Sequence, residues 1–397
     1  MLVILIAVAA VVTIVAYMFE VQLNQQSKGT PDFHVGVAFG GNTTADAKLL
    51  IDKVKGYTNL FVVQSGPVSA NETSLNEIVN YAVSSKLDVI VYFGFFDPSQ
   101  PWREPWLDYA KQQWGNQFLG VYLNDEPGGS VIDANWTGYF TQIRLRNMSQ
   151  YYLHVPEIDL ALNGSLPIDN DQAASHFVNG VASGFGFGLE KLKTRAINAF
   201  TSDYALYWFD YLSGYDTLFA EFGSNQSINQ AIALVRGAAR LQSKDWGAII
   251  TWTYDQPPYL ANGDAIYNQM LSAYMAGAKY TVIFDYPQIP GNPYGILTED
   301  HFSAMQRFWG AIQSLKVTNN PTGEAVLVLP RNYGWGMRNL NDRLWGVWAP
   351  DERASLIWNI SRKLLNQYNL GLDMVYEDAR FPVDGLYANI FYWNQTT

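Results

Sequence analysis

The sequence contains no cysteine among its 397 residues and only four histidines. Disulfide bonds, thiolate nucleophiles and thiolate zinc sites are therefore excluded. The histidines lie far apart in the chain, so the sequence predicts no histidine-based metal site and no cofactor. A hard-cation site built from carboxylates stays open. The four histidines are His34, His154, His176 and His301.

Charged residues are also scarce, at 15% of the chain, and the net charge is −11. Such an acidic balance disfavours binding to phosphate backbones, so no nucleic-acid partner is predicted. Hydrophobic residues reach 48%, which is enough for a large folded core, and aromatic residues reach 15%. In a cleft, aromatic rings would also stack on the flat apolar faces of sugars.

The first 19 residues form an apolar run, and residues 20–32 after it are mostly polar. The run is close to the length of a bilayer-spanning helix. We predict an uncleaved transmembrane helix over 1–19 that anchors the chain in a membrane, and a stalk over 20–32. A cleaved signal peptide and a polymerisation helix for self-assembly are the alternatives.

Eight Asn-x-Ser/Thr acceptors for N-glycosylation support an extracellular location at the cell surface. They are Asn42, Asn71, Asn135, Asn147, Asn163, Asn225, Asn359 and Asn394.

Short apolar runs alternate with amphipathic segments from residue 33 to about 350. The segments between runs are long enough for crossover helices, which parallel strands require. We predict a (β/α)₈ TIM barrel over 33–350, with an insertion over about 128–201 and a C-terminal α/β extension over 351–397. An alternative assigns the residues from about 324 onward to a small second α/β layer. The predicted strands span about 34–40, 60–64, 87–94, 118–123, 216–223, 246–255, 279–285 and 324–330.

Polar and aromatic side chains collect where the predicted strands end. The carboxyl ends of barrel strands converge on one face, so these side chains predict a single cleft. Glycoside hydrolysis uses one protonated and one ionised carboxyl. Two carboxylates with different pKa values, flanked by aromatic rings, therefore indicate this chemistry. The strand-end set is Gln64, Asp97, Asn124, Asp125, Glu126, Glu221, Trp252, Tyr254, Asp255, Asp285 and Tyr286.

Residues 124–127 read Asn-Asp-Glu-Pro and resemble the Asn-Glu-Pro signature of the (β/α)₈ glycoside hydrolase superfamily related to β-galactosidases and cellulases. Residues 273–279, Ala-Tyr-Met-Ala-Gly-Ala-Lys, are similar to the lead-in to the seventh strand of β-galactosidase-like barrels. The resemblance implies that Glu126 is the acid/base. It places the nucleophile at the end of the seventh strand, where this chain carries Asp285 in place of Glu.

Two departures from the pattern are visible, the shorter Asp285 and the insertion of Asp125 into the motif. Glu221 is therefore a second candidate for the partner of Glu126. The remaining strand-end residues are predicted to bind substrate: Gln64, Asp97, Asn124, Asp125, Trp252, Tyr254, Asp255 and Tyr286. The leading hypothesis is a membrane-anchored extracellular glycoside hydrolase that acts on poly- or oligosaccharide. The alternative is a catalytically inactive barrel that serves as a surface carbohydrate-binding, cell-envelope or filament structural protein.

Overall fold

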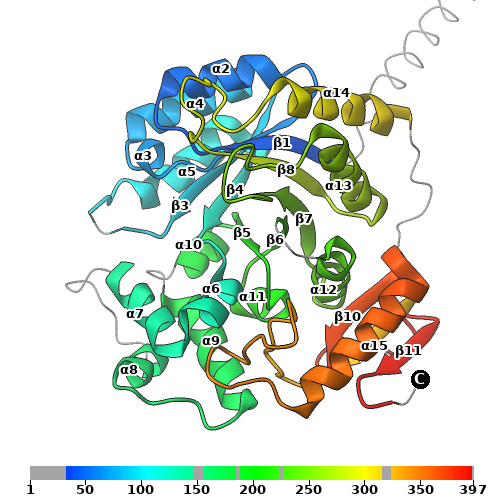
Figure 1. Cartoon of the computed structure of the whole chain (residues 1–397). Coiled ribbons are helices and arrows are strands. Elements are labelled where there is room, and N and C mark those ends of the chain that lie inside the picture. Colours follow the sequence, from blue (N-terminus) through cyan, green and yellow to red (C-terminus); the bar gives the residue numbers. More distant parts are fainter. Residues whose placement is uncertain are drawn as a thin grey trace, which may run out of the picture. The chain divides into compact units, whose positions relative to one another are not determined.

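The computed structural model describes residues 33–97, 99–146, 156–184, 188–223, 227–314 and 323–395. Its centre is a closed barrel of parallel strands β1 to β8 in chain order (Figure 1). The barrel closes because β8 pairs with β1, from His34 opposite Tyr280 to Phe39 opposite Asp285. The strands are β1 His34–Phe39, β2 Leu60–Val63, β3 Asp88–Gly94, β4 Phe118–Leu123, β5 Asn198–Asp203, β6 Thr217–Phe222, β7 Asp245–Ile250 and β8 Tyr280–Asp285.

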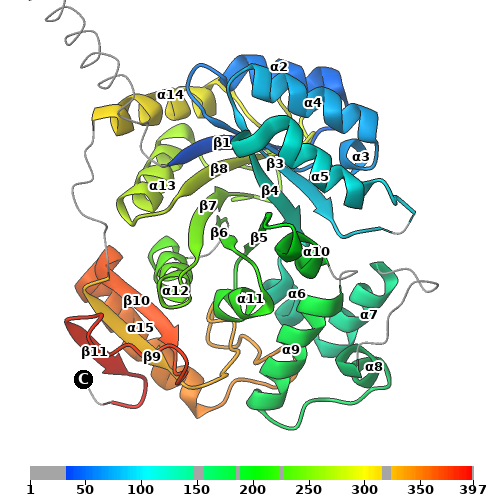
Figure 2. The same ribbon diagram turned by 180° about the vertical axis from the view of Figure 1, so that it is seen from behind.

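Helices surround the barrel because each carries one apolar face. In α12, for example, Ile232, Val235 and Ala239 are buried, and the side chain of Ser227 caps the first turn. Figure 2 shows these helices from behind, outside the ring of strands. They are α2 Thr44–Val54, α3 Gly66–Ser69, α4 Glu72–Ser84, α5 Arg103–Trp114, α11 Tyr207–Ser213, α12 Ile228–Leu241, α13 Gly263–Met275 and α14 Glu299–Ser314.

The segment between β4 and β5 is a helical insertion, at the place where the sequence predicts one. Its helices gather beside the barrel in Figure 1. Trp136, Phe140 and Phe177 are buried there, and the Trp136 and Phe140 rings lie 4.8 Å apart. The helices are α6 Pro127–Ala134, α7 Trp136–Arg146, α8 Pro156–Leu162, α9 Asn170–Gly184 and α10 Gly188–Thr194.

The number of barrel strands matches the prediction, but two of the assignments are wrong. The fifth strand is β5, Asn198–Asp203, which the sequence analysis placed at the end of the insertion. The run predicted as the eighth strand is β9, Ala325–Leu329, which lies outside the barrel. The runs predicted as strands five, six and seven are therefore β6, β7 and β8. The polar second half of β5 explains the miss, since Thr201, Ser202 and Asp203 interrupt its apolar pattern.

The C-terminal part forms a parallel sheet in the order β10-β9-β11, as the alternative for residues from about 324 predicts. Its elements are β9, α15 Glu352–Tyr368, β10 Leu372–Tyr376 and β11 Asn389–Tyr392. The sheet lies against α12 of the barrel, where Arg236 Nε donates to Asp373 Oδ1 at 2.6 Å. Both side chains of this ion pair are buried.

The predicted fold class needs a correction at its N-terminal end. Among the described residues, no helix is both long enough and apolar enough to cross a membrane. The longest described helices, α14 and α15, have 16 and 17 residues, and each buries only part of its surface. A spanning helix needs about 20 apolar residues.

Residues 1–19 and 20–32, predicted as the anchor and the stalk, lie outside the described residues. The described fold is therefore a (β/α)₈ barrel with a C-terminal α/β sheet, and the described residues contain no helix that could cross a membrane. The predicted anchoring in a membrane and the location at the cell surface are withdrawn with that helix. The self-assembly alternative rested on the same residues.

Candidate active site

The barrel lumen is filled by alternate residues of the strands, as a period of two requires. Val62, Phe200, Phe219 and Ile249 belong to this central cluster. The residues two places further along face the lumen at its carboxyl-end mouth: Gln64, Ser202, Glu221 and Thr251. Phe284 and Tyr92 are partly buried and pack against the same cluster. The side chains at the mouth are thus largely polar, above an apolar floor.

The chain leaves β4 through an unusual turn. Asn124 and Glu126 both have a φ of 53°, in the left-handed region. For residues other than glycine this conformation costs about 1–2 kcal/mol and persists only where neighbouring groups enforce it. Here the Glu126 N–H donates to Ser202 O at 3.0 Å, and its carbonyl accepts from Ser130 N–H at 2.8 Å. The backbone on both sides of Glu126 is therefore fixed, by β5 and by α6.

A hydrogen-bond chain connects β4, β5 and β6 at the mouth. The Tyr122 hydroxyl contacts Asp125 and lies 2.7 Å from Ser202 Oγ. Ser202 Oγ lies 2.5 Å from Glu221 Oε1 and 3.2 Å from Asp125 Oδ1. Ser202 thus links Asp125, from the motif at residues 124–127, to Glu221, from β6.

Glu126 and Glu221 form a pair of interacting carboxyl groups at the mouth. Burial and the charges of Asp125 and Asp203 raise the pKa of Glu126 to about 7. Burial and the charges of Glu126 and Asp125 hold the pKa of Glu221 well above its usual range. Among the described residues, no lysine or arginine forms a salt bridge with either glutamate. The pair therefore shares a proton near neutral pH and titrates as a unit.

A second acidic pair lies behind the first. The fully buried Asp203 accepts backbone N–H groups from Gly128 at 2.6 Å and Gly129 at 2.8 Å, in the first turn of α6. It also accepts from the backbone N–H groups that follow it, at residues 204 and 205. Burial raises the pKa of Asp203 to about 6, although these amides lower it, and the charge of Asp203 acts in turn on the fully buried Asp210. Asp203 anchors the helix that begins directly after Glu126.

Asp285 does not join the Glu126–Glu221 pair in these contacts. It ends β8, not the seventh strand, and its Oδ1 accepts the Ile296 N–H at 3.0 Å. Burial raises the pKa of Asp285 to about 7, and the amides of residues 296, 286 and 297 lower it. Its contacts fix the loop after β8, so Glu221, the second candidate, is the acid that meets Glu126.

Of three other predicted residues, Asn124 and Asp97 have hydrogen bonds to nearby groups. The Asn124 side chain is buried and hydrogen-bonded to Tyr215. Asp97 Oδ1 accepts the Ser99 N–H at 2.8 Å in the turn after β3. Gln64 is half-buried at the mouth, and its Oε1 has no hydrogen-bond partner among the described residues.

The predicted aromatic residues meet at the ends of β7 and β8. The Trp252 ring lies 5.9 Å from Phe284 and 6.1 Å from Tyr286, and Phe284 stacks on Tyr286. Tyr286 is 43% exposed and Tyr254 is 51% exposed. Trp252, Phe284 and Tyr286, the aromatic cluster, offer ring surface beside the mouth. Tyr254 and Asp255 lie further out on the exposed loop.

Among the described residues, no group of three or more His, Asp or Glu side chains is arranged to hold a metal ion. The glycosylation acceptors that the structure describes are all exposed, and their modification stays a prediction. They are Asn42, Asn71, Asn135, Asn163, Asn359 and Asn394, whereas Asn147 and Asn225 lie outside the described residues.

Sequence reasoning missed Tyr122, Ser202, Asp203 and Asp210. The missed fifth strand accounts for Ser202 and Asp203. A signal was present, since the polar run 201–203 is followed after a short turn by the aromatic residues of α11. Tyr122 lies in an apolar run that the sequence analysis interpreted as core, because its ring is buried and only its hydroxyl reaches the site.

No protein-family model and no curated protein sequence matches this chain. Solved structures of similar fold include the following two. A β-galactosidase from the Antarctic haloarchaeon Halorubrum lacusprofundi covers 91% of this chain and 69% of its own, with 9% identity and a TM-score of 0.56. GH5_18 from Streptomyces cattleya, in complex with GlcNAc, covers 91% and 98%, with 13% identity and a TM-score of 0.51. The predicted resemblance to (β/α)₈ glycoside hydrolases is thus confirmed for the fold.

Proposed function

We propose that the protein is a glycoside hydrolase that acts on poly- or oligosaccharide through Glu126 and Glu221. The observation that carries the proposal is the pair of interacting carboxyl groups, Glu126 and Glu221, at the barrel mouth, where Ser202 joins Glu221 to Asp125 of the motif. Glycosidic cleavage needs one protonated and one ionised carboxyl at close range. A pair that shares one proton near neutral pH supplies both forms.

In this proposal Glu126 is the acid/base. It is half-buried, and its pKa of about 7 lets it carry a proton at neutral pH. It protonates the oxygen of the leaving sugar while the bond from that oxygen to the anomeric carbon breaks. A carboxylate oxygen of Glu221 bonds to the same carbon. Water then attacks this carbon, gives its proton to Glu126, and releases Glu221.

The close contact of the two carboxyl groups supports retention of configuration. Inverting enzymes hold their carboxyl groups about 6.5–9.5 Å apart to leave room for a water, whereas retaining enzymes hold them about 5–5.5 Å apart. The short-range interaction of Glu126 with Glu221 leaves no room for such a water, and it therefore favours the retaining arrangement. The aromatic cluster supports binding of a sugar ring beside the pair.

The test is hydrolysis of a panel of aryl glycosides by the full chain and by Glu126→Gln and Glu221→Gln. Each variant is expected to lose about 10²–10⁴-fold in kcat/KM. Glu377→Gln, which removes an exposed carboxylate from the C-terminal part of the chain, serves as the control with unchanged activity. A 2-deoxy-2-fluoro glycoside is expected to label Glu221 covalently, as read by peptide mass spectrometry.

A label on another carboxylate would overturn the assignment of Glu221. The second candidate function is a carbohydrate-binding barrel without activity. It is favoured by the hydrogen bond between Ser202 and the buried Glu221, which occupies one carboxyl oxygen of the proposed nucleophile. Wild-type chain that binds glycans, yet hydrolyses none of the panel, would establish that alternative.

A further inference from the structure

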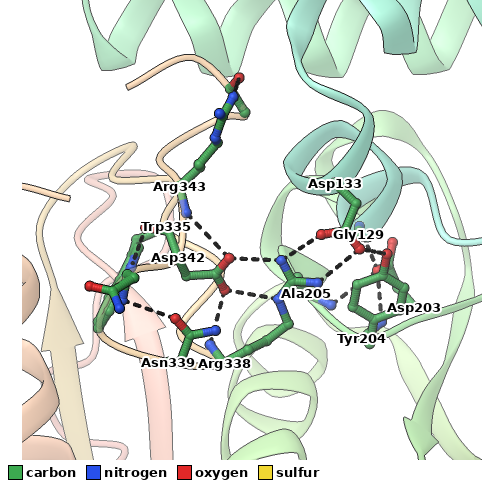
Figure 3. A network of polar contacts seen from close by, with 12 residues as sticks. Gly129, Asp133, Asp203, Tyr204, Ala205, Trp335, Arg338, Asn339, Asp342 and Arg343 are labelled. Carbon is green, nitrogen blue, oxygen red and sulfur yellow. Dashed lines mark hydrogen bonds and ion pairs between the residues drawn. The ribbon is translucent and has the colours of Figure 1, made fainter. Parts of the chain in front are cut away.

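We propose that Arg338, from the segment 331–350 after β9, is a positioning residue for Glu126, so that the C-terminal part of the chain completes the active site. The inference rests on the proposed function, and it gives Glu126 a support from outside the barrel. Figure 3 shows the contacts that carry it.

Arg338 joins two aspartates from different parts of the chain. Its Nη1 and Nη2 donate to Asp133 at 2.9 and 2.7 Å. Its Nε and Nη2 donate to Asp342 at 2.9 and 2.7 Å. The Tyr204 hydroxyl donates to the same Asp133 at 2.6 Å (Figure 3). Because Asp342 is only 4% exposed and belongs to the same segment, it holds the guanidinium in place. Two bidentate hydrogen-bonded pairs of this kind fix the orientation of the guanidinium as well as its distance from the carboxylates.

The consequence is that α6 is held near both of its ends. Asp203 accepts the N–H groups of Gly128 and Gly129 in its first turn. Asp133, in its last turn, is held by Arg338. Gly346 packs so closely that a Cβ there would lie 2.0 Å from Val131 O, and its φ is +67°. The segment after β9 therefore lies directly on the helix.

Glu126 immediately precedes α6, in the left-handed conformation described above. Its carbonyl accepts from Ser130 within that helix, so the direction of its side chain depends on where the helix lies. A shift of about 1 Å in a catalytic group costs on the order of 100-fold in rate. A helix held by the Arg338–Asp133 fork in its last turn and by the contacts of Asp203 with its first turn keeps such shifts small.

Arg338 also sets the charge around Glu126. The acids that act on Glu126 are Asp125 from β4, Asp203 from β5, Glu221 from β6 and Asp133 from α6. Burial alone would raise the pKa of Asp133, yet hydrogen bonds from Arg338 and Tyr204 lower it, so Asp133 is ionised. Arg338 is the cation that offsets this charge. Loss of Arg338 would leave the Asp133 carboxylate near Glu126 without its cationic partner.

The experiment compares Arg338→Met with the matched control Arg353→Met in the full chain. Arg353 also forks onto an aspartate, Asp351 at 2.6 Å, and lies over a tyrosine ring. The readouts are kcat and KM on an aryl glycoside and the ¹³C NMR titration of Glu126, which Glu126→Gln identifies. Arg338→Met is expected to lower kcat at least about 10-fold with a smaller change in KM, and to move the titration of Glu126 to higher pH. The control is expected to change neither.

A second variant covers the case in which Arg338→Met does not fold. Asp133→Asn keeps the shape of the side chain, and it is expected to lower kcat and to move the titration of Glu126 to lower pH. A wild-type titration and kcat in the folded Arg338→Met or Asp133→Asn would overturn the inference. If the wild-type chain is inactive on all glycosides, the proposed function fails, and the NMR titration still decides whether Arg338 acts on Glu126.

Discussion

Glu126 carries most of the chemistry that we infer for this protein. It adopts a strained φ, lies among like charges, and is half-buried. Each of these features costs stability, and together they give a carboxyl that holds its proton near neutral pH. Strain and unfavourable charge are expected to be concentrated at functional sites and offset elsewhere in the fold.

Asp125→Asn tests the charge contribution to Glu126. Removal of a neighbouring negative charge favours the ionised form of Glu126, so its pKa falls. The activity that requires protonated Glu126 is then expected to decline at a pH about one unit lower than in the wild type. The measurement is the pH profile of kcat/KM, with Glu377→Gln as the control that leaves the profile in place. If the high-pH side of the profile does not move, Asp125 does not affect the pKa of Glu126.

Glu221→Gln is expected to stabilise the fold at high pH although it abolishes activity. The pKa of Glu221 is raised in the folded state, so its contribution to stability is full below the unfolded pKa of about 4.3 and declines as pH rises toward the folded value. The Glu221→Gln variant does not lose stability in this way as the pH rises. Its melting temperature should therefore exceed that of the wild type by more at pH 8 than at pH 5. Glu377→Gln, at an exposed position, should show no such trend.

At the scale of elements, the pairing of β4 with β5 brings the site together. Gly120 lies opposite Asn198, Val121 opposite Ala199 and Tyr122 opposite Phe200, and this register places Ser202 beside Asp125 and Glu126. The two strands approach closely at Gly120, whose φ is +150°. An added Cβ there would lie 2.2 Å from Asn198 O. A small shift in this pairing would separate the carboxylates.

Gly120→Ala is therefore expected to lower the free energy of unfolding by about 1–3 kcal/mol, the usual cost of forcing a methyl group into a packed interior. Activity of the folded fraction should fall as well, because the spacing of β4 and β5 changes. Urea denaturation measures the first effect. Gly56→Ala is the matched control, since a Cβ at Gly56 would meet nothing within 4 Å. Equal stabilities of the two variants would contradict the close approach.

At the scale of the whole described fold, the barrel and the C-terminal sheet behave as one structure. Arg236 of α12 and Asp373 of β10 form a buried ion pair, and the Tyr387 hydroxyl donates to Asp373 at 2.8 Å. Together with Arg338, this pair links the C-terminal residues to the barrel at two places. The sheet is thus a support for the barrel.

Asp373→Ala is expected to destabilise the protein by about 3–5 kcal/mol, because it leaves Arg236 buried without its counter-charge. The double variant Arg236→Met with Asp373→Leu should be less destabilised than Asp373→Ala, since no uncompensated charge remains. Chemical denaturation of the single and double variants measures the difference. A double variant that is no more stable than Asp373→Ala would show that the pair contributes little beyond packing.

The sequence by itself determined the eight-stranded barrel and most of its strands, and it pointed to two of the carboxylates at the mouth. Strand periodicity and the acids after apolar runs located Glu126 and Glu221, because these signals are local in the chain. It did not locate β5, since polar residues that face the site break the apolar pattern of that strand. The predicted membrane helix rested on hydropathy alone, and no described helix supports it.

Only the tertiary structure decided which acid meets Glu126. The sequence preferred Asp285 on a strand count that omitted β5, and the closed barrel makes that residue the end of β8. It also decided that residues after 324 form a separate sheet that holds α6 through Arg338. Both facts depend on which strands pair and which segments pack together. Such choices are set by contacts between residues far apart in the chain, and no local pattern encodes them.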